Sequence, residues 1–157
     1  MKYTVCQSLF AVFLAGFMPI TQAEETLRWE GAWVRSVPPG ASVAAAYGKL
    51  VNDSMRAFTV TGVTSALSAD AQMHDVIAEG DQRRMVPLDS VTVPPGASMA
   101  FVPGGRHIML MGFDEPPREG AAVQLCAIAS SRDPVCTEAR VQRQAPMSHV
   151  DYSGDHH

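Results

Sequence analysis

Hydrophobic and polar residues along the chain form many short runs, separated by residues that favour turns. Clusters such as Pro38-Pro39-Gly40, Pro94-Pro95-Gly96 and Pro103-Gly104-Gly105 lie between the runs and break helices. Many short strands at regular spacing are typical of an antiparallel β-sandwich or barrel. The predicted strands are 27–35, 44–52, 57–64, 71–77, 83–91, 97–102, 106–113, 123–129 and 135–142. The pattern therefore predicts an all-β fold.

The first residues follow a different pattern. Lys2 precedes a stretch over 3–20 that is almost wholly apolar, and Thr21-Gln22-Ala23 then offers small residues before two glutamates. This order is typical of a secretory signal peptide cleaved after Ala23. Cys6 lies before the apolar stretch and not after it, so no lipoprotein anchor is expected. We expect a signal peptide at 1–23, a folded domain at 24–145 and a polar tail at 146–157.

The net charge and the cysteines indicate which partners and which covalent cross-links to expect. Loss of the leader would leave 11 basic and 16 acidic residues, a net charge of −5, which disfavours binding to nucleic acid or an anionic membrane. Two cysteines would remain, Cys126 and Cys136. Outside the cytosol such a pair indicates a structural disulfide, here across a hairpin. A redox pair would more often show C-x-x-C spacing.

The sequence carries no motif of a known catalytic class. It contains no G-x-S-x-G, no H-E-x-x-H, no phosphate loop and no dinucleotide fingerprint. Its acidic residues are scattered and do not form a pair at a hydrolase spacing. The protein is therefore not expected to be an enzyme.

Histidine and methionine give the most specific chemical signal. His107 and Met109 are two apart on a predicted strand, so their side chains point to the same face. His74 and Met85 lie on two strands that the turn at Glu79-Gly80-Asp81 would join into a hairpin. Thioethers are soft donors that suit Cu(I), and imidazole also suits copper. If the four side chains converge, they favour Cu(I); otherwise the methionines are ordinary core residues.

The spacing of these residues resembles a family signature. Ten residues separate His74 from Met85, twenty-one separate Met85 from His107, and Met109 follows two positions later. This resembles the signature of PCuAC, a family of periplasmic copper chaperones. The segments Ala32-Trp33-Val34-Arg35 and 103–112 also resemble motifs of that family, and the resemblance covers roughly 29–143.

The resemblance implies a fold, a location and a role. The fold would be a cupredoxin-like antiparallel β-sandwich with Greek-key connections, and the protein would be a periplasmic monomer. His74, Met85, His107 and Met109 would bind Cu(I). The partner would be a copper-accepting protein of cytochrome oxidase assembly, and the copper would reach a respiratory oxidase centre. The cysteine pair and the lack of methionines directly after His74 depart from the family pattern.

The polar tail contains Met147, His149, His156 and His157, which resemble the His/Met-rich extensions of some family members. With the nearby aspartates, these imidazoles would suit Cu(II), whereas the alternative is a tail that binds no metal. Three other functions stay open for the whole protein: copper storage or resistance, a metal-free secreted binding module, and a thiol–disulfide reductase that uses Cys126 and Cys136.

Overall fold

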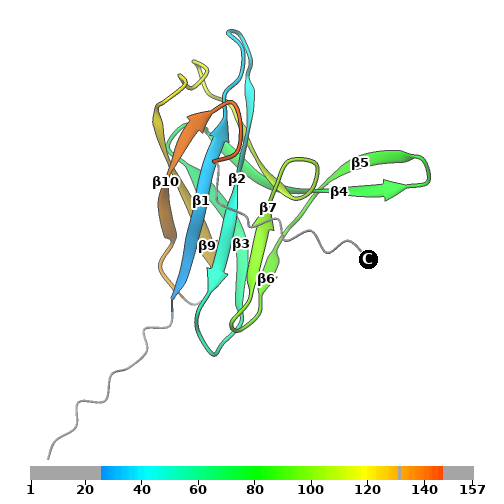
Figure 1. Cartoon of the computed structure of the whole chain (residues 1–157), viewed down its shortest axis with the longest axis vertical. Coiled ribbons are helices and arrows are strands. Elements are labelled where there is room, and N and C mark those ends of the chain that lie inside the picture. Colours follow the sequence, from blue (N-terminus) through cyan, green and yellow to red (C-terminus); the bar gives the residue numbers. More distant parts are fainter. Residues whose placement is uncertain (1–25, 131, 147–157) are drawn as a thin grey trace, which may run out of the picture.

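The computed structural model describes residues 26–130 and 132–146, which form ten β-strands (Figure 1). These strands are β1 (Leu27–Arg35), β2 (Val43–Asn52), β3 (Phe58–Ser65), β4 (Asp70–Glu79), β5 (Gln82–Pro87), β6 (Val91–Val93), β7 (Ser98–Phe101), β8 (His107–Met111), β9 (Ala122–Ala129) and β10 (Val135–Gln142). The all-β prediction is confirmed. Within the described ranges, the structure has no helix that is both long and apolar enough to cross a membrane.

The strands form one open sheet in the order β5-β4-β8-β2-β1-β10-β9-β3-β6, and β7 also pairs with β2. Several neighbours are distant in sequence, such as β8 beside β2 and β9 beside β3, as Greek-key connections require. One correction to the antiparallel prediction is needed, because β1 and β10 run parallel. The first and last strands therefore join the two halves of the sheet.

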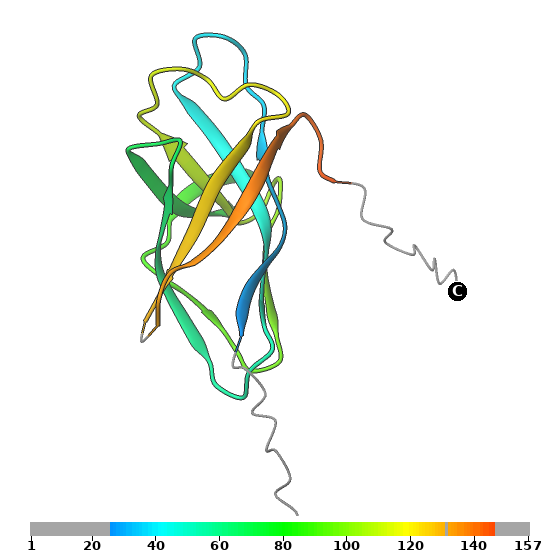
Figure 2. The same ribbon diagram turned by 90° about the vertical axis from the view of Figure 1, so that its left-hand side faces the viewer.

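The sheet folds over so that its two halves face each other across a hydrophobic core (Figure 2). Ala46 of β2 and Ile108 of β8 pack in the same buried cluster as Val60 of β3 and Leu125 of β9. All four side chains are fully buried. Burial of apolar surface between the two halves is therefore the main force that holds the sandwich together.

The single strand predicted at 83–91 is wrong. The structure has two strands there, β5 paired with β4 and β6 paired with β3, separated by residues 88–90. Pro87 lacks a backbone N–H and ends β5, as proline does at strand ends. The chain then crosses to the other half of the sheet, which a continuous strand could not do.

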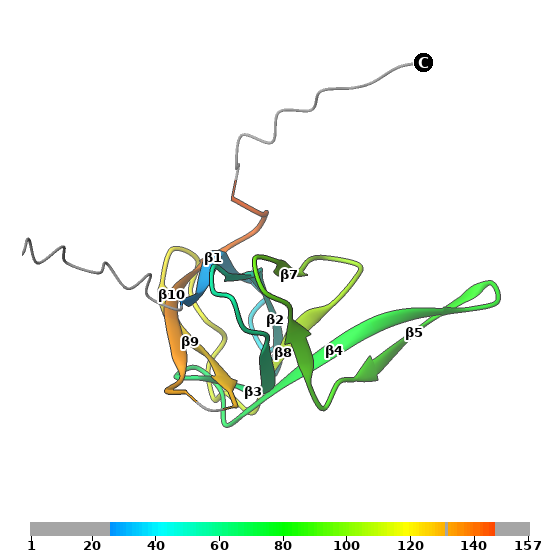
Figure 3. The ribbon, with the colours of Figure 1, turned by 90° about the horizontal axis from the view of Figure 1, so that it is seen from below.

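Strands β4 and β5 form a hairpin that projects from the body of the sandwich (Figure 3). Gly80 in its turn has a φ of 63°, a left-handed conformation that glycine adopts without steric cost. β5 is an edge strand of the sheet. The predicted hairpin between His74 and Met85 therefore forms, and its outer strand is accessible from one side.

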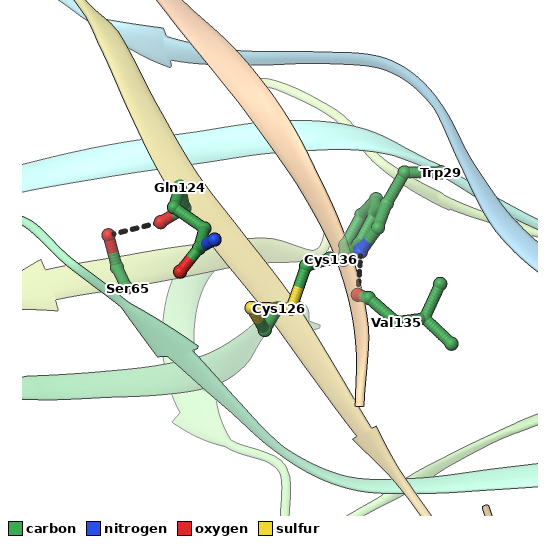
Figure 4. Close-up of a disulfide and its surroundings, with 6 residues drawn as sticks. All are labelled: Trp29, Ser65, Gln124, Cys126, Val135 and Cys136. Atoms are coloured by element: carbon green, nitrogen blue, oxygen red, sulfur yellow. Dashed lines mark hydrogen bonds between the residues drawn. A yellow bond between two sulfur atoms is a disulfide. The ribbon is translucent and has the colours of Figure 1, made fainter. Parts of the chain in front are cut away.

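Cys126 and Cys136 lie directly opposite each other on β9 and β10 and form a disulfide, with their α-carbons 4.0 Å apart (Figure 4). Beside them, Nε1 of Trp29 on β1 donates a hydrogen bond of 3.0 Å to the carbonyl oxygen of Val135. The last strand is thus held by a covalent bond on one side and by an indole hydrogen bond on the other.

Candidate metal centre

The two histidines of the folded domain lie side by side. His74 of β4 and His107 of β8 are directly opposite each other in the antiparallel ladder, and their ring centres are 5.9 Å apart. Ile108 and Leu110 of β8 point into the core, so alternation places His107 on the other face of the strand. His107 is nevertheless only 6% exposed, which shows that this face is partly covered.

Strand register places the two methionines on the same face as the histidines. Met109 of β8 lies opposite Gln72, which is two residues before His74 on β4. Met85 of β5 lies opposite Val76, which is two residues after His74. Residues two apart on a strand share a face, as do residues directly opposite each other. All four residues expected from the sequence therefore belong to one face of β5, β4 and β8.

The four residues are not equally close. Met109 and Met85 lie on opposite sides of the histidine pair, two strands apart and offset by four residues along β4. With strands about 4.8 Å apart and about 3.3 Å per residue, this places their α-carbons roughly 16 Å from each other in a flat sheet. Met85 is also 51% exposed, on the projecting hairpin. The two histidines with Met109 form the compact part of the site, and Met85 stands apart from it.

Each imidazole has one hydrogen-bonded nitrogen. Nδ1 of His107 lies 2.8 Å from the carbonyl oxygen of Gly105, and Nε2 of His74 lies 3.2 Å from Oε1 of Gln72. Nε2 of Gln72 in turn donates to Oδ2 of Asp70 at 2.8 Å. Gln72 and Asp70 were not among the residues predicted from the sequence, although alternation along the predicted strand 71–77 would place Gln72 on the face of His74. Asp70 lies one residue before that predicted range.

The other nitrogen of His74 is unusual. Nδ1 is buried and has no hydrogen-bond partner in the part of the chain that the structure describes. Burial lowers the pKa of His74 from its ordinary value, and the nearby His107 lowers it further because two positive rings would repel each other. The ring is therefore kept neutral, which is the form that binds metals.

The opposite face of the same strands carries an ion pair. Nε of Arg106, the residue before His107, lies 3.1 Å from Oδ2 of Asp75, the residue after His74. Such a partly exposed pair contributes at most about 1 kcal/mol to stability. Its position still matters, because it joins the two strands directly behind the histidine pair.

Comparison with known proteins places the chain in a family. Residues 27–141 match the family described as "Putative lipoprotein LpqE-like". This chain belongs to the LpqE-like family. A "Putative lipoprotein Lxx21020" of Leifsonia xyli subsp. xyli (strain CTCB07) is 30% identical over 95 residues, which are 60% of this chain and 56% of that protein. The match thus spans little more than half of that relative.

Solved structures share the fold of this LpqE-like protein. A copper-bound PCuAC domain from PmoF2 is 26% identical with a TM-score of 0.59, and the match covers 75% of this chain and 92% of that domain. The solution structure of CuI-DR1885 from Deinococcus radiodurans is also 26% identical with a TM-score of 0.59, covering 78% and 83%. The expected cupredoxin-like all-β fold is confirmed.

The donor types on the site face limit which metals the LpqE-like protein could hold there. Across the two described ranges, no three His, Cys, Asp or Glu side chains come close enough to hold a metal ion together. A zinc site of the usual kind needs three or four such ligands. Methionine is the soft donor that this face adds to the histidine pair, and thioethers suit Cu(I). The tail residues Met147, His149, His156 and His157 lie outside the described residues.

Proposed function

We propose that this LpqE-like protein is a periplasmic copper chaperone that binds Cu(I) and delivers it to a copper centre of respiratory cytochrome oxidase. The proposed ligands are His74, Met85, His107 and Met109. The observation that carries the proposal is the pairing of two imidazoles across β4 and β8, with both methionines on the same face. The likeness to a copper-bound PCuAC domain and to CuI-DR1885 supports the same metal.

The site is suited to transfer as well as to binding. Two imidazoles set on neighbouring strands fix the position of the ion, whereas thioethers are weak, labile donors. An acceptor with cysteine thiolates would displace the thioethers one at a time, because thiolate is the stronger soft ligand. Met85 would leave first, since it lies on the projecting hairpin and is the more exposed side of the site. Transfer then proceeds by ligand exchange, without free copper.

The proposed location follows from the chain's own features. The leader expected at 1–23 would export the protein, and the family description names lipoproteins, which are exported. A disulfide between Cys126 and Cys136 also fits an oxidising compartment. In such a compartment thioether ligands have an advantage, because they are not lost to disulfide formation. A second copper site in the tail, suited to Cu(II), is a further part of this proposal.

Competition with a Cu(I) chelator tests the metal site. We expect the wild-type mature protein to take one Cu(I) from the chelator, and His107→Ala to lose most of that affinity while keeping the fold. Met55→Ala is the matched methionine control, because Met55 is 88% exposed and lies outside the site. Unchanged affinity in His107→Ala would refute the site. X-ray absorption at the copper edge would then count sulfur and nitrogen donors in the loaded wild-type protein.

Delivery needs a separate test. A deletion strain should lose cytochrome oxidase activity at low copper, and added copper should restore it. The copper-storage alternative predicts the opposite pattern, namely greater sensitivity to excess copper with normal oxidase activity. That second pattern would refute delivery but not Cu(I) binding.

A further inference from the structure

Three polar side chains follow one another along the site face of β4. Asp70, Gln72 and His74 occupy alternate positions of the strand, so their side chains lie in a row on one face. Nε2 of Gln72 donates to Oδ2 of Asp70 at 2.8 Å, and Oε1 of Gln72 lies 3.2 Å from Nε2 of His74. The glutamine therefore connects the carboxylate to the imidazole.

The carboxylate fixes which way the glutamine amide points. An ionised carboxylate only accepts hydrogen bonds, whereas an amide has an NH₂ donor and a carbonyl acceptor. If the amide of Gln72 were turned over, its oxygen would face the oxygen of Asp70 and a hydrogen bond would be lost. The NH₂ group therefore stays on the Asp70 side, and Oε1 stays on the His74 side.

The glutamine oxygen then fixes the tautomer of His74. Because Oε1 of Gln72 can only accept, Nε2 of His74 must carry the hydrogen. A neutral imidazole has one N–H, so Nδ1 of His74 keeps a lone pair. That atom is buried and unpartnered among the described residues, an unfavourable state for a polar atom without a ligand. Its lone pair is available to a hydrogen-bond donor or to a metal ion.

His107 shows the same arrangement with the nitrogens exchanged. Its Nδ1 lies 2.8 Å from the carbonyl oxygen of Gly105, which can only accept, so Nδ1 carries the hydrogen and Nε2 keeps the lone pair. Metal-binding histidines usually donate their other N–H to a carbonyl or carboxylate in this way. A backbone carbonyl thus fixes the tautomer of His107, whereas the hydrogen-bonded pair Asp70–Gln72 fixes the tautomer of His74.

We propose that Asp70 and Gln72 are positioning residues that hold His74 with its hydrogen on Nε2 and present Nδ1 as the metal-binding atom. The ion is then bound by Nδ1 of His74 and Nε2 of His107. This inference rests on the proposed function for the identity of the ion. The tautomers themselves are properties of the metal-free protein, so they are measurable without copper.

The test is nitrogen NMR on metal-free protein labelled with ¹⁵N-histidine, at about pH 8, above the ordinary histidine pKa of about 6.5. Long-range ¹H–¹⁵N correlations identify which ring nitrogen carries the hydrogen. We expect Nε2–H for His74 and Nδ1–H for His107 in the wild type. Gln72→Leu should release His74 into a mixture of tautomers and weaken Cu(I) binding roughly 10-fold to 100-fold. Gln72→Glu combined with Asp70→Asn exchanges acceptor and donor between the two side chains, keeps an acceptor facing Nε2 of His74, and should keep both the tautomer and most of the affinity.

Gln124→Leu is the matched control, because Gln124 is an exposed strand glutamine whose side chain makes no hydrogen bond within the described ranges. Gln124→Leu should change neither the tautomer of His74 nor the affinity for Cu(I). Nδ1–H on His74 in the wild type would overturn the proposal, and so would an unchanged tautomer in Gln72→Leu. On loading with Cu(I), the nitrogen shifts should change most at Nδ1 of His74 and Nε2 of His107. Expected tautomers without any Cu(I) binding would instead refute the proposed function.

Discussion

His74 on β4 and His107 on β8 face each other across one step of an antiparallel ladder, and their ring centres lie 5.9 Å apart. An ion held by one nitrogen of each ring, at about 2 Å from each, would fit between rings at this separation. Both residues are on strands rather than loops, and the Arg106–Asp75 pair joins these strands from behind. The spacing of the two imidazoles is thus set by the sheet itself, before any ion binds.

The first prediction concerns pH and the stability of the metal-free protein. Burial and the neighbouring His107 lower the pKa of folded His74, whereas the unfolded chain has the ordinary value of 6.5. As the pH falls below that value, the unfolded state takes up the proton first, so folding stability is lost until the pH passes the lowered folded pKa. Urea unfolding from about pH 8 to about pH 5 should show this loss in the wild type. His74→Gln should show a smaller loss, and equal pH dependence in both proteins would contradict the prediction.

The second prediction concerns the unequal placement of the methionines. Met109 is on the same strand as His107, while Met85 is half-exposed on the projecting hairpin. We expect Met109→Ala to weaken Cu(I) binding by about tenfold or more, which is about 1.4 kcal/mol, and Met85→Ala to weaken it less. Chelator competition measures both values, and Met55→Ala serves as the methionine control because Met55 is 88% exposed and lies outside the site. A larger effect of Met85→Ala would show that the hairpin folds onto the bound ion.

A third prediction concerns Asn52, a fully buried polar residue at the end of β2. The two hydrogens of its Nδ2 are shared among the carbonyl oxygens of Arg56, Val93 and Pro94, and its Oδ1 accepts from the backbone N–H and the hydroxyl of Ser54. Asn52→Ala would leave several of these buried groups unpaired, and we expect a loss of about 3 kcal/mol or more.

Urea denaturation measures this loss as a lower midpoint with an unchanged slope. Met55→Ala in the adjoining loop should change stability by no more than about 0.5 kcal/mol, because that side chain is almost wholly exposed. A loss in Asn52→Ala as small as the one in Met55→Ala would show that water replaces the missing hydrogen bonds.

The fourth prediction separates the disulfide from the metal site. Cys126 and Cys136 join β9 to β10, and neither strand contributes a residue to the histidine face. Replacing both by alanine removes a cross-link over a ten-residue separation, which should cost about 3 kcal/mol of stability. Thermal unfolding should show the lower stability, while Cu(I) affinity stays at the wild-type level. A loss of copper affinity in the folded double variant would instead implicate the cysteines in function.

Much of the fold is predictable from the sequence because it depends on local pattern. The bounds of β1 and β10 match the prediction to the residue, since residues that favour turns, such as Pro38-Pro39-Gly40 after β1 and Asp133-Pro134 before β10, lie just outside them. The strand predicted at 83–91 is wrong, because Pro87 and the polar residues Asp89 and Ser90 interrupt it, and the local pattern does not show that the chain then crosses to the other half of the sheet. The parallel pairing of β1 with β10 also could not be predicted from the sequence, because pairing between distant strands depends on the whole topology.

Only part of the candidate site could be predicted from the sequence, for the same reason. The two-residue spacing of His107 and Met109 places them on one face, which is a local property. The opposition of His74 and His107 requires β4 to pair with β8, and three strands intervene in the sequence. Gln72 was missed because a polar residue on an exposed strand face is ordinary, and its role is visible only through its two hydrogen bonds.

The parallel contact of β1 with β10 has a consequence for the order in which the protein is made. A chain synthesised or threaded from its amino end delivers β1 first, yet the partner that covers that edge of β1 arrives last. Until then β1 keeps an open row of backbone donors and acceptors on that side, which is a template for unwanted pairing. The domain is therefore expected to complete its folding only after release of nearly the whole chain, slowly and through long-range contacts. Truncation before Val135 would leave that edge permanently uncovered.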